Sequence, residues 1–413
     1  MRFLFLTLCT SDDSYKGDYK LIRQRIHILT SLGHQVDVLF FRPSFLLSSF
    51  PSRLSNPLPH EGQSLLLRYS LPLALFSAPF LFLSHLIRQY PIQTFLSRLI
   101  AFQLRNQLQE LSLRYDQLHA FHFRSYHLVG TIPFTLPSFF ELIDSYSLNY
   151  SRLLLHPMSL LRQLLVRFEL KRIRQLEHNL IFNSINTLHP VFVSAVDAAF
   201  ISSTTPVRET HVVPLYVNSP PFKPIHYDPY SPLRLIFFGN LDYPPNIIAV
   251  QELLAILKIA KSHHPDLRLQ LTVAGRNLPS SLVNSSAGIS NISFISPVDD
   301  MQTVVTAHHL CVLPMNISSG LQSKLIESFS WSMPVITTTT CYSSLSSTLN
   351  TSGNPHCFLA DTQAEFISIL YSIYIGQGDI NSYTKQAYNL VLEGLSFEAV
   401  SSRYEHLISS VNI

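Results

Sequence analysis

The chain has 413 residues, of which 46% are hydrophobic, enough to build sizeable cores and to exclude a disordered chain. Charged residues make up only 13%, against ~25% in a typical soluble domain, which excludes a coiled coil or an acidic tail protein and favours contact with a membrane surface or a partner. The net charge of +3 is unevenly divided, since residues 1–217 carry +7 and residues 218–413 carry −4. This asymmetry predicts two domains with different partners.

The N-terminal half alternates strands with helices. Residues 3–7 form an apolar strand, an apolar repeat at helical spacing follows over 22–29, and Gly33 ends that helix before a strand at 36–41. A strand–helix–strand unit of this length predicts a parallel sheet with helices on its faces. The first apolar run stops at Cys9, too early for a signal peptide, so we expect a buried strand there.

Residues 71–87 form a mostly apolar segment of seventeen residues. A transmembrane helix needs ~20 apolar residues, and Pro72, Pro79 and His85 interrupt this run. Two interpretations remain: a helix in the core, or a monotopic element that contacts a membrane surface.

A basic cluster follows at residues 162–174. It consists of Arg162, Arg167, Lys171, Arg172 and Arg174. These side chains could bind anionic lipid or an anionic substrate. The alternative is a solvated helix face that pairs with Glu169 and Glu177.

Five prolines within residues 218–232 predict an extended linker at the point where the charge balance changes sign. We therefore expect an N-terminal domain at 1–217, the linker at 218–232, a C-terminal domain at 233–395, and a helix at 396–413 that returns to the N-terminal domain. The C-terminal domain again alternates the two elements. Strands are expected at 233–238, 267–273, 292–294, 310–313 and 334–338, and helices at 246–261, 304–308 and 324–332. Regular alternation predicts a doubly wound sheet that binds ligands at the carboxyl ends of its strands.

The four cysteines lie far apart, so neither a disulfide framework nor a zinc site is expected, and free thiols fit a reducing cytoplasm. The chain contains no Walker loop, GxGxxG, GxSxG or HExxH pattern. The C-terminal half has no DxD-type carboxylate pair beside a strand end, and we expect no metal ion.

The pattern with the most chemical content is a strand end, a glycine-containing loop, a helix and a proline-led strand within residues 314–337. Backbone N–H groups at the helix start form a site for an anion, and Lys324 adds a positive charge suited to phosphate. Glu327 follows on the same helix face, placed to bind ribose hydroxyls. The alternative is a capping box from Ser319 to Gln322, before a core helix with a surface Lys324–Glu327 pair. The pattern alone leaves both open.

This stretch resembles the donor-binding motif of glycosyltransferase family 4, the retaining GT-B enzymes that use nucleotide sugars. Further segments resemble segments of that family in the same order along the chain. They are residues 32–36, 141–150, 193–197, 237–246, 273–276 and 294–300. The resemblance implies an α/β fold of GT-B type, with two doubly wound Rossmann-like domains facing a central cleft.

The resemblance also implies roles for particular residues. The donor would be bound by Gly17, Gly239, Asn240, Arg276, Ser319, Gly320, Leu321, Gln322, Ser323, Lys324 and Glu327. Asp18, Arg124 and Asp144 fall on the acceptor side. His122 is expected near the transferred sugar and is grouped with Lys324 and Glu327 as catalytic. The alternative for His122 is a structural histidine at a strand end, with His119 and His127 as rivals.

One departure from the family pattern concerns the paired glutamates. The first of them, eight residues before Glu327, is Ser319 here, and in the family that carboxylate contacts the donor sugar. Some polysaccharide-type relatives also lack it and carry a loop that residues 320–324 resemble.

The implied function is transfer of a sugar from a nucleotide-sugar to a saccharide or lipid-linked acceptor with retention, in surface polysaccharide or glycolipid assembly. An inactive nucleotide-binding scaffold and a sugar-nucleotide epimerase remain as alternatives. We expect a cytoplasmic protein with peripheral contact to the inner face of an anionic membrane. No cofactor beyond the donor substrate and no nucleic-acid partner are expected.

Overall fold

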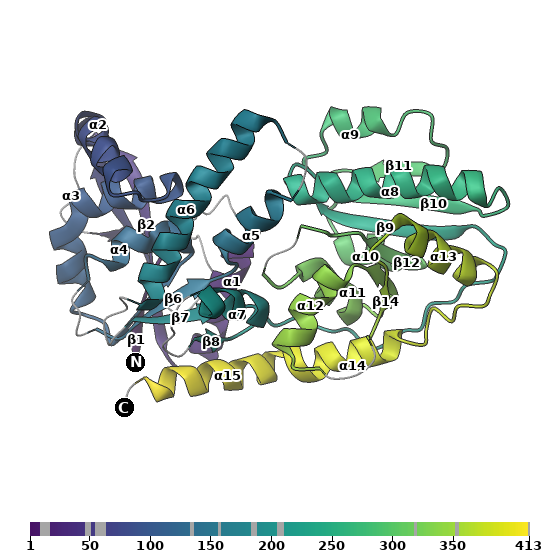
Figure 1. Cartoon of the computed structure of the whole chain (residues 1–413). Helices are drawn as coiled ribbons and strands as arrows, with labels where there is room; N and C mark the ends of the chain where they lie inside the picture. Colours follow the sequence, from purple (N-terminus) through teal and green to yellow (C-terminus); the bar gives the residue numbers. More distant parts are fainter. Residues whose placement is uncertain are drawn as a thin grey trace. The chain divides into compact units, whose positions relative to one another are not determined.

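The chain folds into two compact units (Figure 1). The computed structural model describes residues 1–8, 17–45, 51–53, 63–132, 136–155, 158–182, 188–204, 210–317, 320–351 and 355–411. Unit 1 comprises Met1–Leu215 and Ser401–Ile413, and unit 2 comprises Tyr216–Val400.

In its described residues, unit 1 contains one sheet of eight strands in the order β3-β4-β2-β1-β5-β6-β7-β8, and only the β3–β4 pair is antiparallel. The strands are β1 (Arg2–Leu6), β2 (Gln35–Ser44), β3 (Ser52–Arg53), β4 (Ser64–Ser70), β5 (Gln117–Phe121), β6 (Ser138–Leu142), β7 (Leu188–Phe192) and β8 (His211–Val212). The central strands are buried on both faces, which explains why β1 is continuously apolar after Arg2.

Helices connect these strands. They are α1 (Gly17–Ser31), α2 (Leu71–Ile87), α3 (Phe95–Ser112), α4 (Tyr126–Val129), α5 (Tyr146–Leu153), α6 (Leu160–Phe182) and α7 (Ala195–Thr204), with 3-10 turns η2 (Ile92–Thr94) and η3 (Phe123–Ser125). Helix α1 ends before Gly33, which adopts a φ of +80°, a conformation that favours glycine. The predicted strand–helix–strand unit at the start of the chain is present.

Unit 1 encloses a polar network that includes the end of the chain. Helix α15 (Phe397–Ser410) brings Tyr404 into the core, where its hydroxyl donates to Glu141 Oε1 at 2.8 Å and lies 2.9 Å from His119 Nδ1. The Arg25 guanidinium lies 3.3 Å from Glu141 Oε2. Burial alone would raise the pKa of Glu141, but Arg25, His119 and Tyr404 together hold it below its usual range. The buried carboxylate is therefore compensated, as burial of a charge requires.

Helix α2 is not a core helix, so the interpretation of residues 71–87 as core is wrong. Its buried residues are Ala74, Ser77 and His85, whereas most of its large apolar side chains face outward. Among the helices of the described residues, none has both the length and the apolar character needed to cross a bilayer.

In its described residues, unit 2 contains a parallel sheet of six strands in the order β11-β10-β9-β12-β13-β14. The strands are β9 (Leu233–Asn240), β10 (Leu269–Arg276), β11 (Ile292–Ile295), β12 (Leu310–Leu313), β13 (Val335–Thr337) and β14 (Phe358–Leu359). The chain runs outward from β9 through β10 to β11 and then returns to the other side of β9 at β12. The strand order therefore reverses between β9 and β12, and such a switch point is where doubly wound sheets bind ligands.

The helices of unit 2 cover both faces of this sheet (Figure 1). They are α8 (Pro244–His263), α9 (Ser280–Ser285), α10 (Met301–Thr306), α11 (Ser323–Ser330), α12 (Thr339–Thr348), α13 (Gln363–Tyr374) and α14 (Thr384–Leu395). Helix α8 contacts α9 and α13, whereas α11 contacts α12 and α14. The proline-rich stretch 218–229 has no helix or strand and packs on unit 2 through hydrogen bonds such as Ile225 N–H to Asn381 Oδ1.

Candidate functional site

The carboxyl end of β9 is built on two glycines. Gly239 and Gly275 are paired across β9 and β10. A Cβ atom on Gly275 would lie 1.8 Å from the carbonyl oxygen of Gly239, so only glycine allows the two strands to approach here. Gly239 itself has a φ of +150°, and a Cβ atom there would lie 2.6 Å from Cε of Lys324. Gly239 thus leaves room for the Lys324 side chain at the switch point.

The Lys324 amine is fixed by a hydrogen-bonded chain. Lys324 Nζ donates to Asn246 Oδ1 at 2.6 Å, and Asn246 Nδ2 donates to the carbonyl oxygen of Asn240 at 2.6 Å. Asn246 is 3% exposed and stands in the first turn of α8. Asn246 was expected only as the first residue of a helix, and its part in this site was not predicted. The signal in the sequence is the Pro-Asn pair at residues 245–246, in the short segment that follows the strand-end Gly239.

The environment of Lys324 destabilises its charged form. Burial lowers the pKa of Lys324 to about 8, and Glu327 and Cys341 oppose that change. The amine also lies 5.5 Å from the centre of the Phe237 ring. Lys324 is therefore not one half of a surface ion pair, and the interpretation of Lys324–Glu327 as a solvated pair is wrong. An amine held in this way gains most from a ligand that brings negative charge.

Helix α11 begins beside this amine. Gln322 is its N-cap residue, and the Gln322 side chain makes no capping hydrogen bond to the helix start. A capping box from Ser319 to Gln322 would place the N-cap three residues earlier, so that alternative is wrong; Ser319 itself lies outside the described residues. Gly320, with a φ of +66°, Leu321 and Ser323 complete this turn. The N–H groups at a helix start carry partial positive charge and can bind an anion.

Two other residues expected at the donor site border the same strand ends. Arg276 is exposed at the end of β10, paired with Asn240 across the strands. Asn277 Nδ2 donates to Asn240 Oδ1 at 3.0 Å, which fixes the Asn240 side chain. Glu327 is half-buried one turn along α11, close enough to Lys324 to affect its pKa. The structure thus brings Gly239, Asn240, Arg276, Lys324 and Glu327 to one edge of the unit 2 sheet.

His122 lies at the end of β5 in unit 1. Its Nδ1 accepts the backbone N–H of Arg124 at 3.1 Å and Arg124 Nε at 3.2 Å, and its Nε2 lies 2.7 Å from the Tyr146 hydroxyl. Two donors on Nδ1 leave the ring proton on Nε2. His122 therefore caps the turn η3, as its structural alternative expects, and its role beside a sugar stays a prediction.

The two alternative histidines, His119 and His127, have structural roles. His119 is fully buried and stacks on Phe139, and His127 is packed among rings with a pKa lowered to about 3 by burial. Neither is presented at a strand end as His122 is.

The remaining unit 1 candidates are partly described. Asp144 accepts a hydrogen bond from Asn149 Nδ2 at 3.1 Å, and Arg124 is half-buried against His122. Gly17 is the first residue of α1, the helix that follows β1. The side chain of Asp18 lies outside the described part of the chain. The acceptor-side roles of Asp18, Arg124 and Asp144 stay predictions.

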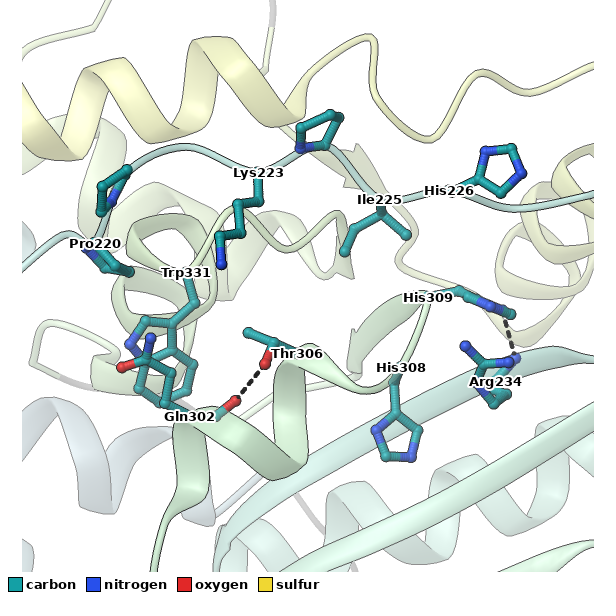
Figure 2. Close-up of a pocket in the computed structure, with 12 residues that line it drawn as sticks. Pro220, Lys223, Ile225, His226, Arg234, Gln302, Thr306, His308, His309 and Trp331 are labelled. Carbon is teal, nitrogen blue, oxygen red and sulfur yellow. Dashed lines mark hydrogen bonds between the residues drawn. The ribbon is translucent and has the colours of Figure 1, made fainter.

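Unit 2 also contains a pocket of about 420 Å³ away from these residues (Figure 2). The proline-rich stretch forms one wall, and α10, the residues 308–309 that follow it, Arg234 and Trp331 form the other. His309 Nδ1 accepts the backbone N–H of Arg234 at 3.1 Å at one end of the pocket. None of the predicted site residues is among those that line it. Trp331 therefore lines this pocket and also packs on Phe238, with 5.8 Å between the two ring centres.

Chemically, the unit 2 site combines a fixed cation, a helix start and a glycine-lined strand end. This combination suits a diphosphate, because both the amine and the helix start attract negative charge. In the described residues, no group of three histidine, cysteine, aspartate or glutamate side chains is placed to hold a metal ion.

Comparisons with known proteins concern the fold of the chain and the domain that contains this site. Residues 232–371 match the family model described as glycosyl transferases group 1. Among curated protein sequences, none matches the chain significantly. Solved structures match over nearly the whole chain. Sucrose-phosphate synthase from Thermosynechococcus elongatus has 13% identity and a TM-score of 0.65, covering 99% of this chain and 98% of that one.

Two further matches carry nucleotides. An Escherichia coli trehalose-6-phosphate structure bound with UDP-2-fluoro glucose has 10% identity and a TM-score of 0.61, covering 100% of this chain and 99% of that one. HepE from Anabaena, in complex with UDP, has 12% identity and a TM-score of 0.60, covering 99% of this chain and 100% of that one. The chain therefore has the GT-B fold, and its residues 232–371 match the family model of the group 1 glycosyl transferases.

Proposed function

We propose that this protein is a glycosyltransferase that moves a sugar from a nucleotide-sugar donor to a saccharide or lipid-linked acceptor, with retention, in surface polysaccharide or glycolipid assembly. The observation that carries the proposal is the Lys324 amine, fixed by Asn246 at the switch point of a group 1 glycosyl transferase domain. The nucleotide ligands of the similar structures support the choice of donor. Retention and the acceptor class rest on the family resemblance.

In this proposal the donor diphosphate binds at Lys324 and at the start of α11. Negative charge grows on the diphosphate as the sugar leaves, and a fixed cation with helix N–H groups stabilises that charge without rearranging. Glu327 holds the donor ribose and Arg276 binds near the base or the phosphates. His122 contacts the transferred sugar, with Arg124, Asp18 and Asp144 on the acceptor side. No metal ion or cofactor takes part.

The alternatives differ in what they do to the donor. Ser319, in place of a glutamate, favours an inactive scaffold that binds a nucleotide without releasing sugar. An epimerase would convert the donor with no acceptor present. We also propose a cytoplasmic location with peripheral contact to the membrane, on the basis of the composition.

A thermal-shift panel with UDP, GDP, ADP and their common sugars tests the proposal. A nucleotide at 100 times its Kd should add about 2.7 kcal/mol of stability to the wild type, and Lys324→Ala should lose most of that gain. Incubation of the stabilising nucleotide-sugar with saccharide acceptors then separates the candidates. Free nucleoside diphosphate with an extended acceptor supports a transferase, whereas an unchanged donor identifies a scaffold and a converted donor an epimerase. If no nucleotide stabilises the wild type, the proposal fails.

A further inference from the structure

Helix α2 presents an apolar stripe to solvent. Leu73, Phe76, Phe80, Leu83 and Ile87 are exposed, and their spacing of three and four residues places them on one face. Phe76 and Phe80 are 76% and 72% exposed. A surface helix normally turns such a stripe toward the core, but α2 turns Ala74, Ser77 and His85 inward instead. The helix contains no aspartate, glutamate, lysine or arginine, and its one histidine, His85, is buried.

Helix α6 adds a second exposed stripe in the same unit. The surface of its N-terminal half carries Leu160, Leu161, Leu164, Leu165 and Phe168, whose exposed fractions lie between 57% and 79%. Helix α6 is joined to the turn η2, which follows α2 in the chain, because Glu169 of α6 accepts the backbone N–H of Ile92 at 2.6 Å. Figure 1 shows α2 at the top of unit 1 and α6 rising to the same level. Exposed apolar side chains in this number on two helices of one unit mark an interaction surface.

Basic side chains run beside the α6 stripe. Arg167, Lys171 and Arg174 recur every three or four residues, about 90° around the helix from the leucines. With Leu154 and Leu170 they line a pocket of about 420 Å³. The alternative in which Glu169 and Glu177 neutralise this cluster holds only for Arg172, which lies 3.9 Å from Glu169. Glu177 turns inward to Ser145 and Ser147, so the exposed basic residues keep their charge for another partner.

We propose that the exposed faces of α2 and α6 dock unit 1 on a bilayer surface that contains anionic lipids. The leucines and phenylalanines would enter the boundary between headgroups and acyl chains, and Arg167, Lys171 and Arg174 would bind lipid phosphates. A second copy of the chain fits less well. Helix α2 has no acidic residue and both glutamates of α6 are buried, so the same surface of a second copy would bring no negative charge to the basic side chains. The proposal supplies the surface for the peripheral location proposed above, and it does not depend on sugar transfer.

Co-sedimentation of the full-length chain with vesicles tests this proposal. The vesicles are phosphatidylcholine alone and an equimolar mixture of phosphatidylcholine with phosphatidylglycerol, each at low and high salt. We expect the mixed vesicles to bind the wild type at least tenfold more strongly than the neutral ones at low salt. Each basic side chain near an anionic surface contributes about fivefold, so Arg167→Gln/Lys171→Gln/Arg174→Gln should weaken binding to mixed vesicles about a hundredfold.

The apolar part is tested separately. Phe76→Gln/Phe80→Gln should weaken binding about tenfold or more to the mixed vesicles, because both rings lose a place in the membrane boundary. Leu113→Gln is the matched control, since Leu113 is 75% exposed at the end of α3 and should bind like the wild type. All these positions are on the surface, so thermal midpoints should stay unchanged.

Three results would overturn the proposal. One is a wild type that binds neither kind of vesicle, and another is a Phe76→Gln/Phe80→Gln variant that binds as well as Leu113→Gln. The third is a wild-type dimer, detected by light scattering, that this double variant converts to a monomer, which would make the surface an interface between copies. None of these measurements uses a nucleotide-sugar, so their failure is distinct from failure of the proposed transferase activity.

Discussion

Replacement of Lys324 by methionine should make the protein more stable and weaken its binding of nucleotide. Lys324 is held where its charged form is unfavourable, with a pKa lowered from 10.5 to about 8. Methionine has nearly the same length and no charge, so it should fill the space beside Gly239. Stability and binding should therefore change in opposite directions, as expected where a functional site retains a destabilising group.

The magnitude follows from the pKa. A fall from 10.5 to about 8 corresponds to about 3 kcal/mol of unfavourable free energy for the charged amine in the folded chain. The variant leaves Asn246 Oδ1 without its donor, which costs about 1–2 kcal/mol. The net gain in the free energy of unfolding is about 1–2 kcal/mol at neutral pH. Affinity for a nucleoside diphosphate should fall about tenfold to a hundredfold, because a charge-assisted hydrogen bond is lost.

The lowered pKa of Lys324 also determines how the stability gain of Lys324→Met changes with pH. Because the folded pKa is below the unfolded one, the amine destabilises the fold fully below pH 8, and this cost disappears as the pH rises to 10.5. The advantage of Lys324→Met should therefore be largest at neutral pH and shrink above pH 8. Chemical denaturation over this range measures it, with Lys258→Met, an exposed lysine of α8, as the control.

Either of two results would refute this reasoning. A Lys324→Met protein whose stability matches the wild type at every pH would show that the amine carries no such cost. A variant that nucleotides stabilise as strongly as the wild type would show that Lys324 does not hold the phosphates.

Three further predictions concern the fold. Gly275→Ala should lower the free energy of unfolding by more than about 3 kcal/mol, because its Cβ would lie 1.8 Å from the Gly239 oxygen. In the control Gly288→Ala the new Cβ meets no atom within 4 Å, and the positive φ alone should cost about 1 kcal/mol. Denaturation curves of both variants measure the difference. Burial lowers the pKa of His127 to about 3, so its stabilising contribution is lost as the pH falls below 6.5. Lowering the pH from 7 to 5 should therefore reduce the free energy of unfolding by about 2 kcal/mol through His127. His127→Asn should remove this loss, and a variant with the same pH dependence of stability as the wild type would contradict the reasoning. Tyr404→Phe should cost about 1–3 kcal/mol by depriving Glu141 of a hydrogen bond, and amide exchange within 401–411 should become faster; unchanged exchange would show that the hydroxyl does not hold this helix.

Much of the fold could be predicted from the sequence. Strands such as β9 and β12 are short apolar runs that end at Gly239 and Pro314, and helices follow them at regular spacing, so the parallel, doubly wound arrangement follows from periodicity. Element ends differed by a few residues, as at α10, which ends at Thr306. Backbone turns rather than apolar spacing decide where a short helix stops.

The site was predictable where local chemistry determined it. Lys324 follows a glycine loop at a helix start, and that pattern alone marks an anion site. Asn246 was missed because its role depends on a contact with Lys324, 78 residues later, which no local pattern contains. For the same reason the exposure of α2 could not be predicted. An apolar helix has the same sequence pattern whether its apolar side chains pack in a core or face solvent.

The measurement that tests the central claim most directly is amide hydrogen exchange of the full chain with and without the nucleoside diphosphate that the panel identifies. We predict slower exchange at the start of α11, over residues 320–324, and at the end of β9, over 239–246, with no change in α13 as the internal control. Protection confined to other segments, or none at saturating nucleotide, would contradict a donor site at Lys324.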